Sequence, residues 1–108
     1  MIRLSEDQRG LLLLAHANDN HALQSTALAE VYGLPPNVRL RGKSGRHYSA
    51  QTISDYHKSR SSLTRSLRRL EHRGLIERNP GRATGSAGYR LTAEGQAVAH
   101  DLQEETAA

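Results

Sequence analysis

The order of apolar and polar residues predicts a chain built mainly from helices. Near the start, Ser5 and Gln8 have the spacing of a helix-capping box, in which each residue bonds the backbone of the other. The apolar residues that follow, centred on Leu11 and Leu12, form one face of a first helix. We expect this helix to end in the polar, turn-forming stretch 18–20.

A short strand and a second helix are predicted next. Residues 21–24 have the composition of a short strand, and residues 27–32 give a helix with Ser25 or Thr26 as its N-cap. Gly33 is placed to close that helix, because glycine tolerates the left-handed backbone that often follows a helix end. The two prolines after it cannot continue a helix, so residues 34–51 are predicted as a basic loop or an insertion.

The clearest periodicity starts at Thr52, which with Asp55 resembles another capped helix start. Apolar residues then recur at alternating spacings of three and four, which indicates a long helix with one buried face. Only Arg60 interrupts this face. Its apolar members are Ile53, Tyr56, Leu63, Leu67 and Leu70.

The opposite face of this long helix carries positive charge and no carboxylate. Its members are Ser54, Lys58, Ser61, Arg65, Arg68, Arg69 and His72. A helix face that is only solvated usually mixes acidic with basic residues, because opposite charges three or four positions apart stabilise a helix. A face that lacks them indicates a surface for phosphates, although an exposed basic face without a ligand is the alternative.

A hairpin and a last helix complete the pattern. Gly74 ends the long helix, residues 75–78 and 89–91 are predicted as strands, and the turn-rich stretch between them forms a loop. Thr92 then caps a helix of about three turns, with 102–108 as a fraying tail. The fold class is therefore mainly α with a small β-hairpin, in a single domain over residues 1–108.

Composition and charge narrow the function. The chain of 108 residues has no Cys, which excludes disulfides and thiolate metal sites, and no Phe or Trp, so its core must be aliphatic. Residues 39–90 contain 13 basic and 3 acidic residues, a net charge of +10, whereas the rest contains 2 basic and 8 acidic residues, a net charge of −6. A basic block between acidic ends predicts a polyanion-binding face.

The sequence offers little for catalysis, metal binding or membrane insertion. The six His show no ligand spacing, so we expect no metal and no cofactor. The stretch 42–44 lacks the upstream glycine of a phosphate loop, and no nucleophile motif occurs, so we expect no catalytic residues and no enzyme activity. The apolar run 11–14 is too short for a signal or a membrane span, which predicts a cytoplasmic protein without a membrane partner.

Two segments together resemble a known family. Residues 61–78 are similar to the recognition helix and first wing strand of MarR-like winged-helix regulators, and 91–95 resembles the LT-x-x-G stretch that follows the wing there. The resemblance implies a winged helix-turn-helix fold, double-stranded DNA as partner and a homodimer on a pseudo-palindrome. It does not identify a small-molecule effector.

The predicted DNA-binding residues combine this resemblance with the basic pattern. The resemblance implies that Ser61, Ser62, Thr64, Arg65 and Arg69 face the major groove, that Arg82 serves the wing, and that Leu63, Leu67, Leu70, Leu75 and Leu91 are core. The full predicted set is Lys58, Arg60, Ser61, Ser62, Thr64, Arg65, Arg68, Arg69, Arg82, Arg41, Lys43 and Arg46.

We therefore predict sequence-specific binding of double-stranded DNA by a transcriptional regulator. The alternative is a winged-helix module that binds another protein in a replication, partition or chromatin assembly. RNA is disfavoured because the chain lacks an aromatic stacking platform.

The chain departs from the MarR-like pattern in two places. MarR-like regulators are usually longer at their ends, and they join the second helix to the recognition helix by a tight turn. Here residues 34–51 lie between the two helices, so either they are an insertion or 52–57 is itself the short second helix. The apolar face, interrupted only at Arg60, favours one long helix.

Overall fold

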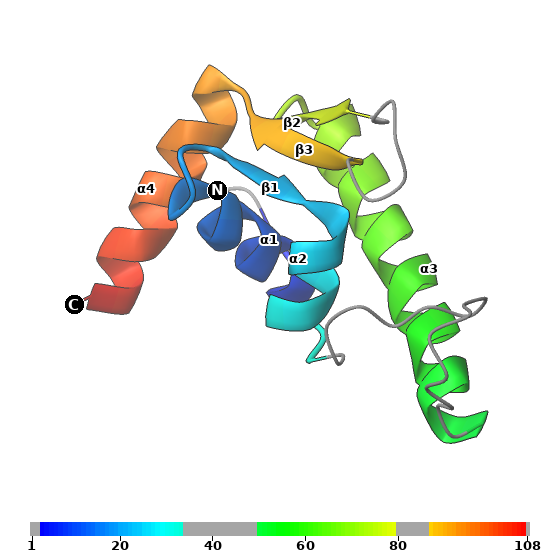
Figure 1. Cartoon of the computed structure of the whole chain (residues 1–108). Coiled ribbons are helices and arrows are strands. Elements are labelled where there is room, and N and C mark those ends of the chain that lie inside the picture. The colour runs from blue at the N-terminus through cyan, green and yellow to red at the C-terminus, as the bar shows by residue number, and fades with distance from the viewer. Residues whose placement is uncertain (1–2, 34–49, 80–86, 108) are drawn as a thin grey trace.

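The computed structural model describes residues 3–33, 50–79 and 87–107, and these form a mostly helical fold with one small sheet (Figure 1). The helices are α1 (Glu6–His16), α2 (Gln24–Glu30), α3 (Ala50–His72) and α4 (Ala93–Ala107). The strands are β1 (His21–Leu23), β2 (Ile76–Asn79) and β3 (Gly88–Leu91). This order agrees with the predicted fold class in outline, a mainly α chain with a small β-hairpin.

The start of α1 confirms the predicted capping box. The backbone N–H of Gln8 donates to Ser5 Oγ, and the Ser5 N–H donates to Gln8 Oε1, both at 3.2 Å. These bonds satisfy backbone donors that the first turn of a helix leaves without partners. The capped helix buries Leu11 and Leu12 completely in the core.

Helix α2 corrects the predicted capping by Ser25 or Thr26. The helix begins earlier, at Gln24, and its N-cap is Leu23, which makes no side-chain capping bond. The Gln24 N–H donates instead to the Ala87 carbonyl beside β3, at 2.9 Å. This long-range bond holds the chain where the helix starts, so strand β1 runs directly into α2.

Helix α3 is one continuous helix of 23 residues, as the apolar periodicity predicted. Thr52 is not its N-cap, because the helix already begins at Ala50. Its last residue is His72, and Gly74 closes the helix as predicted, with a φ of +76° in the left-handed region that suits glycine. The N–H of Leu75 then bonds the carbonyl of Leu70 at 3.0 Å and reverses the chain toward β2.

The three strands form an antiparallel sheet in the order β1-β3-β2. His21 pairs with Arg90, and Arg90 pairs with Glu77, so these three residues form one row across the sheet. All three side chains are exposed. The other face of the sheet contributes Ile76, Tyr89 and Leu91 to the core, and the central strand thereby ties the predicted hairpin to the N-terminal helices.

The junction between α3 and α4 explains the LT-x-x-G stretch physically. Thr92 caps α4 as predicted, because its Oγ1 accepts from the Gly95 N–H at 3.1 Å and donates to the Gly74 carbonyl at 2.6 Å. The Thr92 N–H also donates to the Leu75 carbonyl at 3.0 Å. Gly95 is required because a Cβ there would fall onto that same carbonyl oxygen. Helix α4 is longer than the predicted three turns, since it continues to Ala107.

The core is aliphatic, as the composition predicted. The leucines at 63, 67, 70, 75 and 91, all predicted as core, are at most 5% exposed. One aromatic residue is fully enclosed with them, Tyr89, whose hydroxyl donates to the Leu11 carbonyl at 2.7 Å. Burial raises the pKa of this Tyr89 hydroxyl, because the ionised form would lose its hydration.

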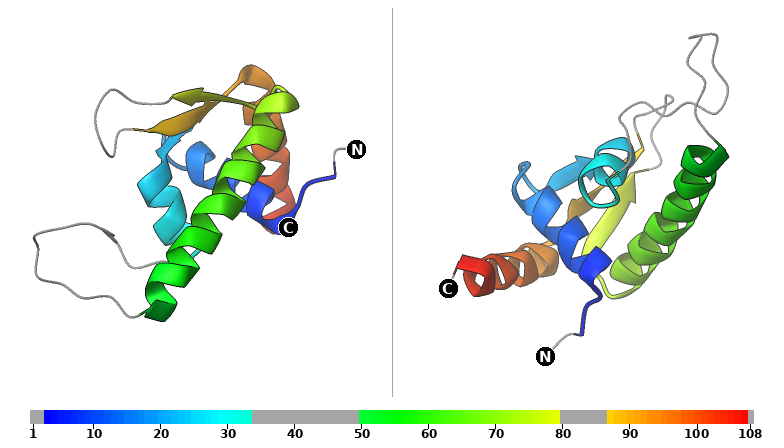
Figure 2. Two further views of the ribbon diagram at one scale, coloured as in Figure 1. Left: turned by 90° about the vertical axis from the view of Figure 1, so that its right-hand side faces the viewer. Right: turned by 90° about the horizontal axis from the view of Figure 1, so that it is seen from below.

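The elements place α3 and α4 on opposite sides of the molecule. Figure 1 shows α1 and the sheet between these two helices, and the right-hand view of Figure 2 shows the same separation from below. The first part of α3 extends past the rest of the fold in both views. None of the helices in the described ranges is long and apolar enough to cross a membrane.

Candidate nucleic-acid interface

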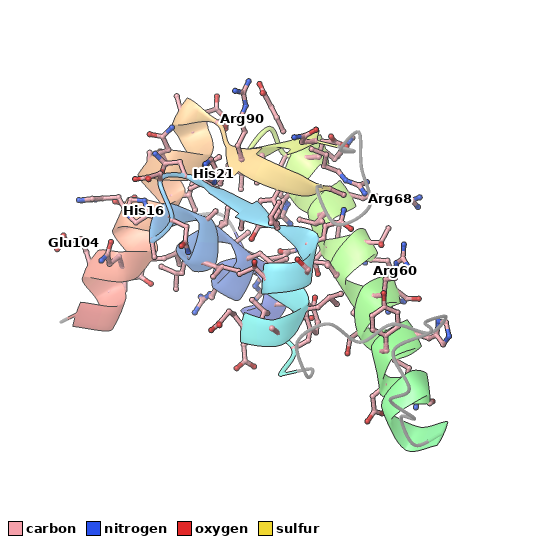
Figure 3. All side chains as sticks on the ribbon, in the orientation of Figure 1. His16, His21, Arg60, Arg68, Arg90 and Glu104 are labelled. Atoms are coloured by element: carbon pink, nitrogen blue, oxygen red, sulfur yellow. The ribbon has the colours of Figure 1, made fainter. Side chains whose placement is uncertain are left out.

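One face of α3 is a continuous cationic surface. We call it the cationic stripe, and it consists of Ser54, Lys58, Ser61, Arg65, Arg68, Arg69 and His72. Every member is exposed, whereas Leu63, Leu67 and Leu70 on the opposite face are buried. Figure 3 labels Arg68 of the stripe and also Arg60, which belongs to the opposite, leucine-bearing face of the helix but is exposed as well.

The stripe follows directly from the helical repeat. Successive residues turn by about 100°, so packing the leucine face on the core sends the stripe outward. The two carboxylates of α3, Asp55 and Glu71, fall on the flanks of the helix by the same rotation. The outward face therefore presents positive charge without an interleaved negative charge.

Hydroxyl groups on α3 are partly committed to the helix itself. Thr64 Oγ1 donates to the Arg60 carbonyl at 2.9 Å, and Arg65 Nη2 donates to Ser62 Oγ at 3.4 Å. Thr64 and Ser62 are half-buried, whereas Ser61 and Arg65 are exposed. An oxygen that donates its proton to the backbone still accepts a bond, so Thr64 keeps acceptor capacity toward a ligand.

Tyr32, just after α2, lies beside α3. Burial raises the pKa of Tyr32 to about 12, and Asp7 acts in the same direction, whereas Ser66 and the positive charge of Arg65 act against it. The hydroxyl is buried without a bonding partner in hydrogen-bond geometry among the described residues, although Ser66 and Asp7 lie near it. Tyr32 thus packs the end of α2 between α1 and the middle of α3.

The structure brings most of the predicted DNA-binding residues together on α3. Six of them are exposed, namely Lys58, Arg60, Ser61, Arg65, Arg68 and Arg69, and Ser62 and Thr64 are half-buried beside them. The remaining predicted residues, Arg41, Lys43, Arg46 and Arg82, lie outside the described residues.

Sequence reasoning missed two basic residues that the fold places at the end of the stripe. Arg73 Nη1 donates to the Arg3 carbonyl at 2.7 Å, although the two residues are 70 positions apart. The spacing of four from Arg69 to Arg73 is a helical signal that would have included Arg73. Arg3 stands alone before α1, so no local pattern indicates its position.

The basic residues of the sheet contribute less. The Arg90 guanidinium donates twice to Glu77 Oε2, once from Nε at 2.8 Å, so its charge is balanced within the hairpin. Arg78, also in β2, is half-buried. An exposed ion pair of this kind adds little to stability, and it leaves α3 as the main positive surface of the described chain.

Comparisons with known proteins agree with this geometry. A protein-family model described as HxlR-like helix-turn-helix matches residues 49–106, which is more than half of the chain. The match spans α3, the hairpin and α4, and so includes the whole cationic stripe. Searches among curated proteins and among solved structures gave no match.

The winged helix-turn-helix class predicted from the sequence is thus confirmed, and the likeness to MarR-like regulators stays a resemblance between related classes. The chain belongs to the HxlR-like helix-turn-helix family, whose members bind DNA and regulate transcription.

Proposed function

We propose that the protein is a sequence-specific regulator of transcription that places α3 in the major groove of double-stranded DNA. The observation that carries this proposal is the cationic stripe of α3. The stripe is exposed and contains no carboxylate, and the family match covers all of it. In a helix-turn-helix protein this helix is the recognition helix.

The length of α3 allows different residues of the stripe to contact bases and phosphates. A helix of 23 residues is about 34 Å long, and the major groove admits an α-helix. We assign base contacts to Ser61 and Arg65, since arginine bonds both guanine acceptors at once. Arg68 and Arg69 lie one turn further on and contact phosphates, which supply affinity and register.

The hairpin and the basic loop extend this interface in the proposal. Arg82, between β2 and β3 in the sequence, would contact the DNA backbone or the minor groove, and Arg41, Lys43 and Arg46, which precede α3 in the sequence, would add phosphate contacts. These residues are proposed from their charge and their place in the chain, next to the ends of β2 and α3. Each would raise the salt dependence of binding rather than its base preference.

We further propose that the protein binds as a homodimer, acting in the cytoplasm, with α1 and α4 as its dimer surface. Helix α4 lies on the other side of the molecule from α3, with α1 between them (Figure 1), so pairing through α4 and the adjoining surface of α1 leaves both recognition helices exposed. The half-buried Val98 and Leu102 of α4 offer apolar area for this contact. A two-fold symmetric dimer predicts two half-sites in inverted orientation.

One experiment tests the ligand and the assembly together. The full chain would be used to select bound duplexes from a random pool, and the retained sequences would be examined for a motif and its symmetry. An inverted repeat is expected. A pool without enrichment, or binding without salt dependence, would overturn the proposal, because phosphate contacts by lysine and arginine release counterions.

Arg65 provides the sharpest single-residue test of the proposed readout. The substitution Arg65→Ala should weaken binding to the selected duplex by about 1–3 kcal/mol and relax base preference at one position. Arg9→Ala, which removes an equal charge from the exposed surface of α1, is the matched control. Equal effects of the two substitutions would show that Arg65 contributes charge alone.

A further inference from the structure

A surface depression lies where the chain before α1 meets the last turns of α3. From the N-terminal side it is lined by Arg3, Leu4, Ser5 and Gln8, and from α3 and its end by Arg68, Arg69, His72 and Arg73. Four of these eight residues are arginines, and none carries a carboxylate. Figure 2 shows the start of the described chain beside the end of α3.

The fold brings these positive charges together in spite of their repulsion. Arg73 is held in the depression because its guanidinium donates to the Arg3 carbonyl. This bond uses one of the five guanidinium donors, so the others remain available to a ligand. Within the described part of the chain, Arg90 pairs with Glu77 and His100 lies near Asp101 and Glu104, and none of these contacts involves an arginine of the depression. Among the residues that the structure describes, no carboxylate pairs with an arginine of this cluster.

The depression also faces the positive end of a helix dipole. Ser5 is the N-cap of α1, and both Ser5 and Gln8 line the depression. Partial positive charge at a helix start favours an anion nearby, but Glu6 and Asp7 in the first turn of α1 offset part of it. The guanidinium groups therefore supply most of the positive field in the depression. Arginine is the side chain best suited to a phosphate, because its planar fork donates two parallel hydrogen bonds.

We propose that this depression is a binding site for a phosphate group. Either the backbone of a bound duplex or a small phosphorylated molecule would supply that chemistry. Binding of phosphate by the protein without DNA goes beyond the proposed regulation. Because Arg68 and Arg69 belong to both the depression and the cationic stripe, an occupant of the depression competes with DNA for two of the same charges.

The first arm of the test uses inorganic phosphate on the full chain. Thermal unfolding would be followed while phosphate replaces chloride at constant ionic strength, for the wild type, Arg73→Gln, Arg3→Gln and Arg9→Gln. A ligand that binds only the folded state stabilises it by RT ln(1 + [L]/Kd), so Tm rises as the ligand concentration rises. We expect phosphate to raise the Tm of the wild type and Arg9→Gln clearly more than that of the two depression variants.

The variants are chosen so that general effects cancel. Phosphate stabilises many proteins by exclusion from their surface, but that effect is common to all four proteins. Arg9 is exposed on α1 and does not line the depression, so Arg9→Gln controls for the loss of one charge. Arg3→Gln keeps the backbone carbonyl that Arg73 bonds, so this variant preserves the tie between the N-terminal segment and α3.

The second arm identifies the source of the phosphate. If DNA supplies it, the slope of log K against log salt for duplex binding should fall by about 1 in Arg73→Gln relative to Arg9→Gln. If a free molecule supplies it, the slope stays equal to that of Arg9→Gln, while phosphate-dependent stabilisation is lost in Arg73→Gln. Either result supports the site.

The proposal is overturned if Arg73→Gln and Arg3→Gln behave as Arg9→Gln does in both arms. Failure of the wild type to bind any duplex would overturn the proposed function instead. The phosphate titration would still test phosphate binding in the depression, because it uses no DNA.

Discussion

Helices α3 and α4 lie on opposite sides of the molecule and differ sharply in charge. Helix α3 contains five Lys or Arg and two Asp or Glu, a net charge of +3, whereas α4 contains four Asp or Glu and no Lys or Arg, a net charge of −4. Both helices pack apolar residues against the same core. The inner faces of both helices therefore contribute to the core, whereas their outer faces carry opposite charge.

This difference shows why net charge alone is a poor guide to the ligand. The whole chain carries only +4, yet the fold concentrates positive charge on one side and negative charge on the other. A duplex carries about one negative charge per 1.7 Å of its axis, so it is attracted by the α3 side and repelled by α4. The asymmetry orients the protein on DNA before any base is read.

The largest expected effect comes from removing the positive charge of α3. The triple variant Arg65→Gln, Arg68→Gln and Arg69→Gln should weaken duplex binding by more than 100-fold, since each arginine contact is worth roughly 1–3 kcal/mol. All three side chains are exposed, so the fold should be retained. Fluorescence anisotropy at fixed salt measures the affinity, and circular dichroism checks the helix content.

The matched control removes three charges from the other side. Glu94→Gln, Glu104→Gln and Glu105→Gln change exposed residues of α4 and should leave duplex affinity unchanged or slightly higher. Because α4 belongs to the proposed dimer surface, size-exclusion chromatography checks that this variant keeps the oligomeric state of the wild type. Equal weakening by the two triple variants would contradict the comparison, because the side of the molecule would then not matter.

A smaller effect, on stability, is expected where the two helices are joined. Gly95→Ala would place a methyl group on the Leu75 carbonyl oxygen, which already accepts a bond from Thr92. Backbone cannot move aside as a flexible side chain can, so the free energy of unfolding should fall by about 1–3 kcal/mol or more. Urea denaturation measures it. The control Gln96→Ala changes an exposed neighbour and should cost far less.

The sequence alone predicted the elements whose signals are local. The leucines of α3 repeat along one helix, the capping box of α1 spans four residues, and Gly74 and Thr92 mark helix ends through their own backbone preferences. These interactions join residues close in sequence, so a pattern along the chain contains them. The outward face of α3 was predicted for the same reason.

The features that were missed depend on residues far apart in the sequence. The start of α2 is fixed by the bond from the Gln24 N–H to the Ala87 carbonyl. The prediction that Ser25 or Thr26 caps this helix was therefore wrong, because the N-cap is Leu23. The bond from Arg73 to the Arg3 carbonyl joins residues that are 70 positions apart in the sequence. Contacts of this kind exist only after folding, and a single sequence carries no pattern for them.

The smallest expected effect concerns pH. A buried tyrosine of the core ionises at alkaline pH, whereas the arginines of the cationic stripe stay charged. Tyr89, on the central strand between α3 and α1, is buried with its pKa raised, whereas an unfolded tyrosine ionises near pH 10. The folded state then holds a proton that the unfolded state loses, so stability is complete below about pH 10 and falls as pH rises above it. Guanidinium groups remain charged over this range.

Tyr89→Phe should lower the free energy of unfolding at pH 7 by about 1 kcal/mol, because the buried Leu11 carbonyl loses its donor. The same variant should lose less stability than the wild type between pH 9 and pH 11, since it has one fewer buried group to ionise. Tyr32, whose pKa is raised to about 12, acts in the same direction and accounts for part of the remaining loss. Urea denaturation across this pH range gives both values. An identical pH dependence in the variant and the wild type would show that ionisation of Tyr89 does not limit the stability of the protein at alkaline pH.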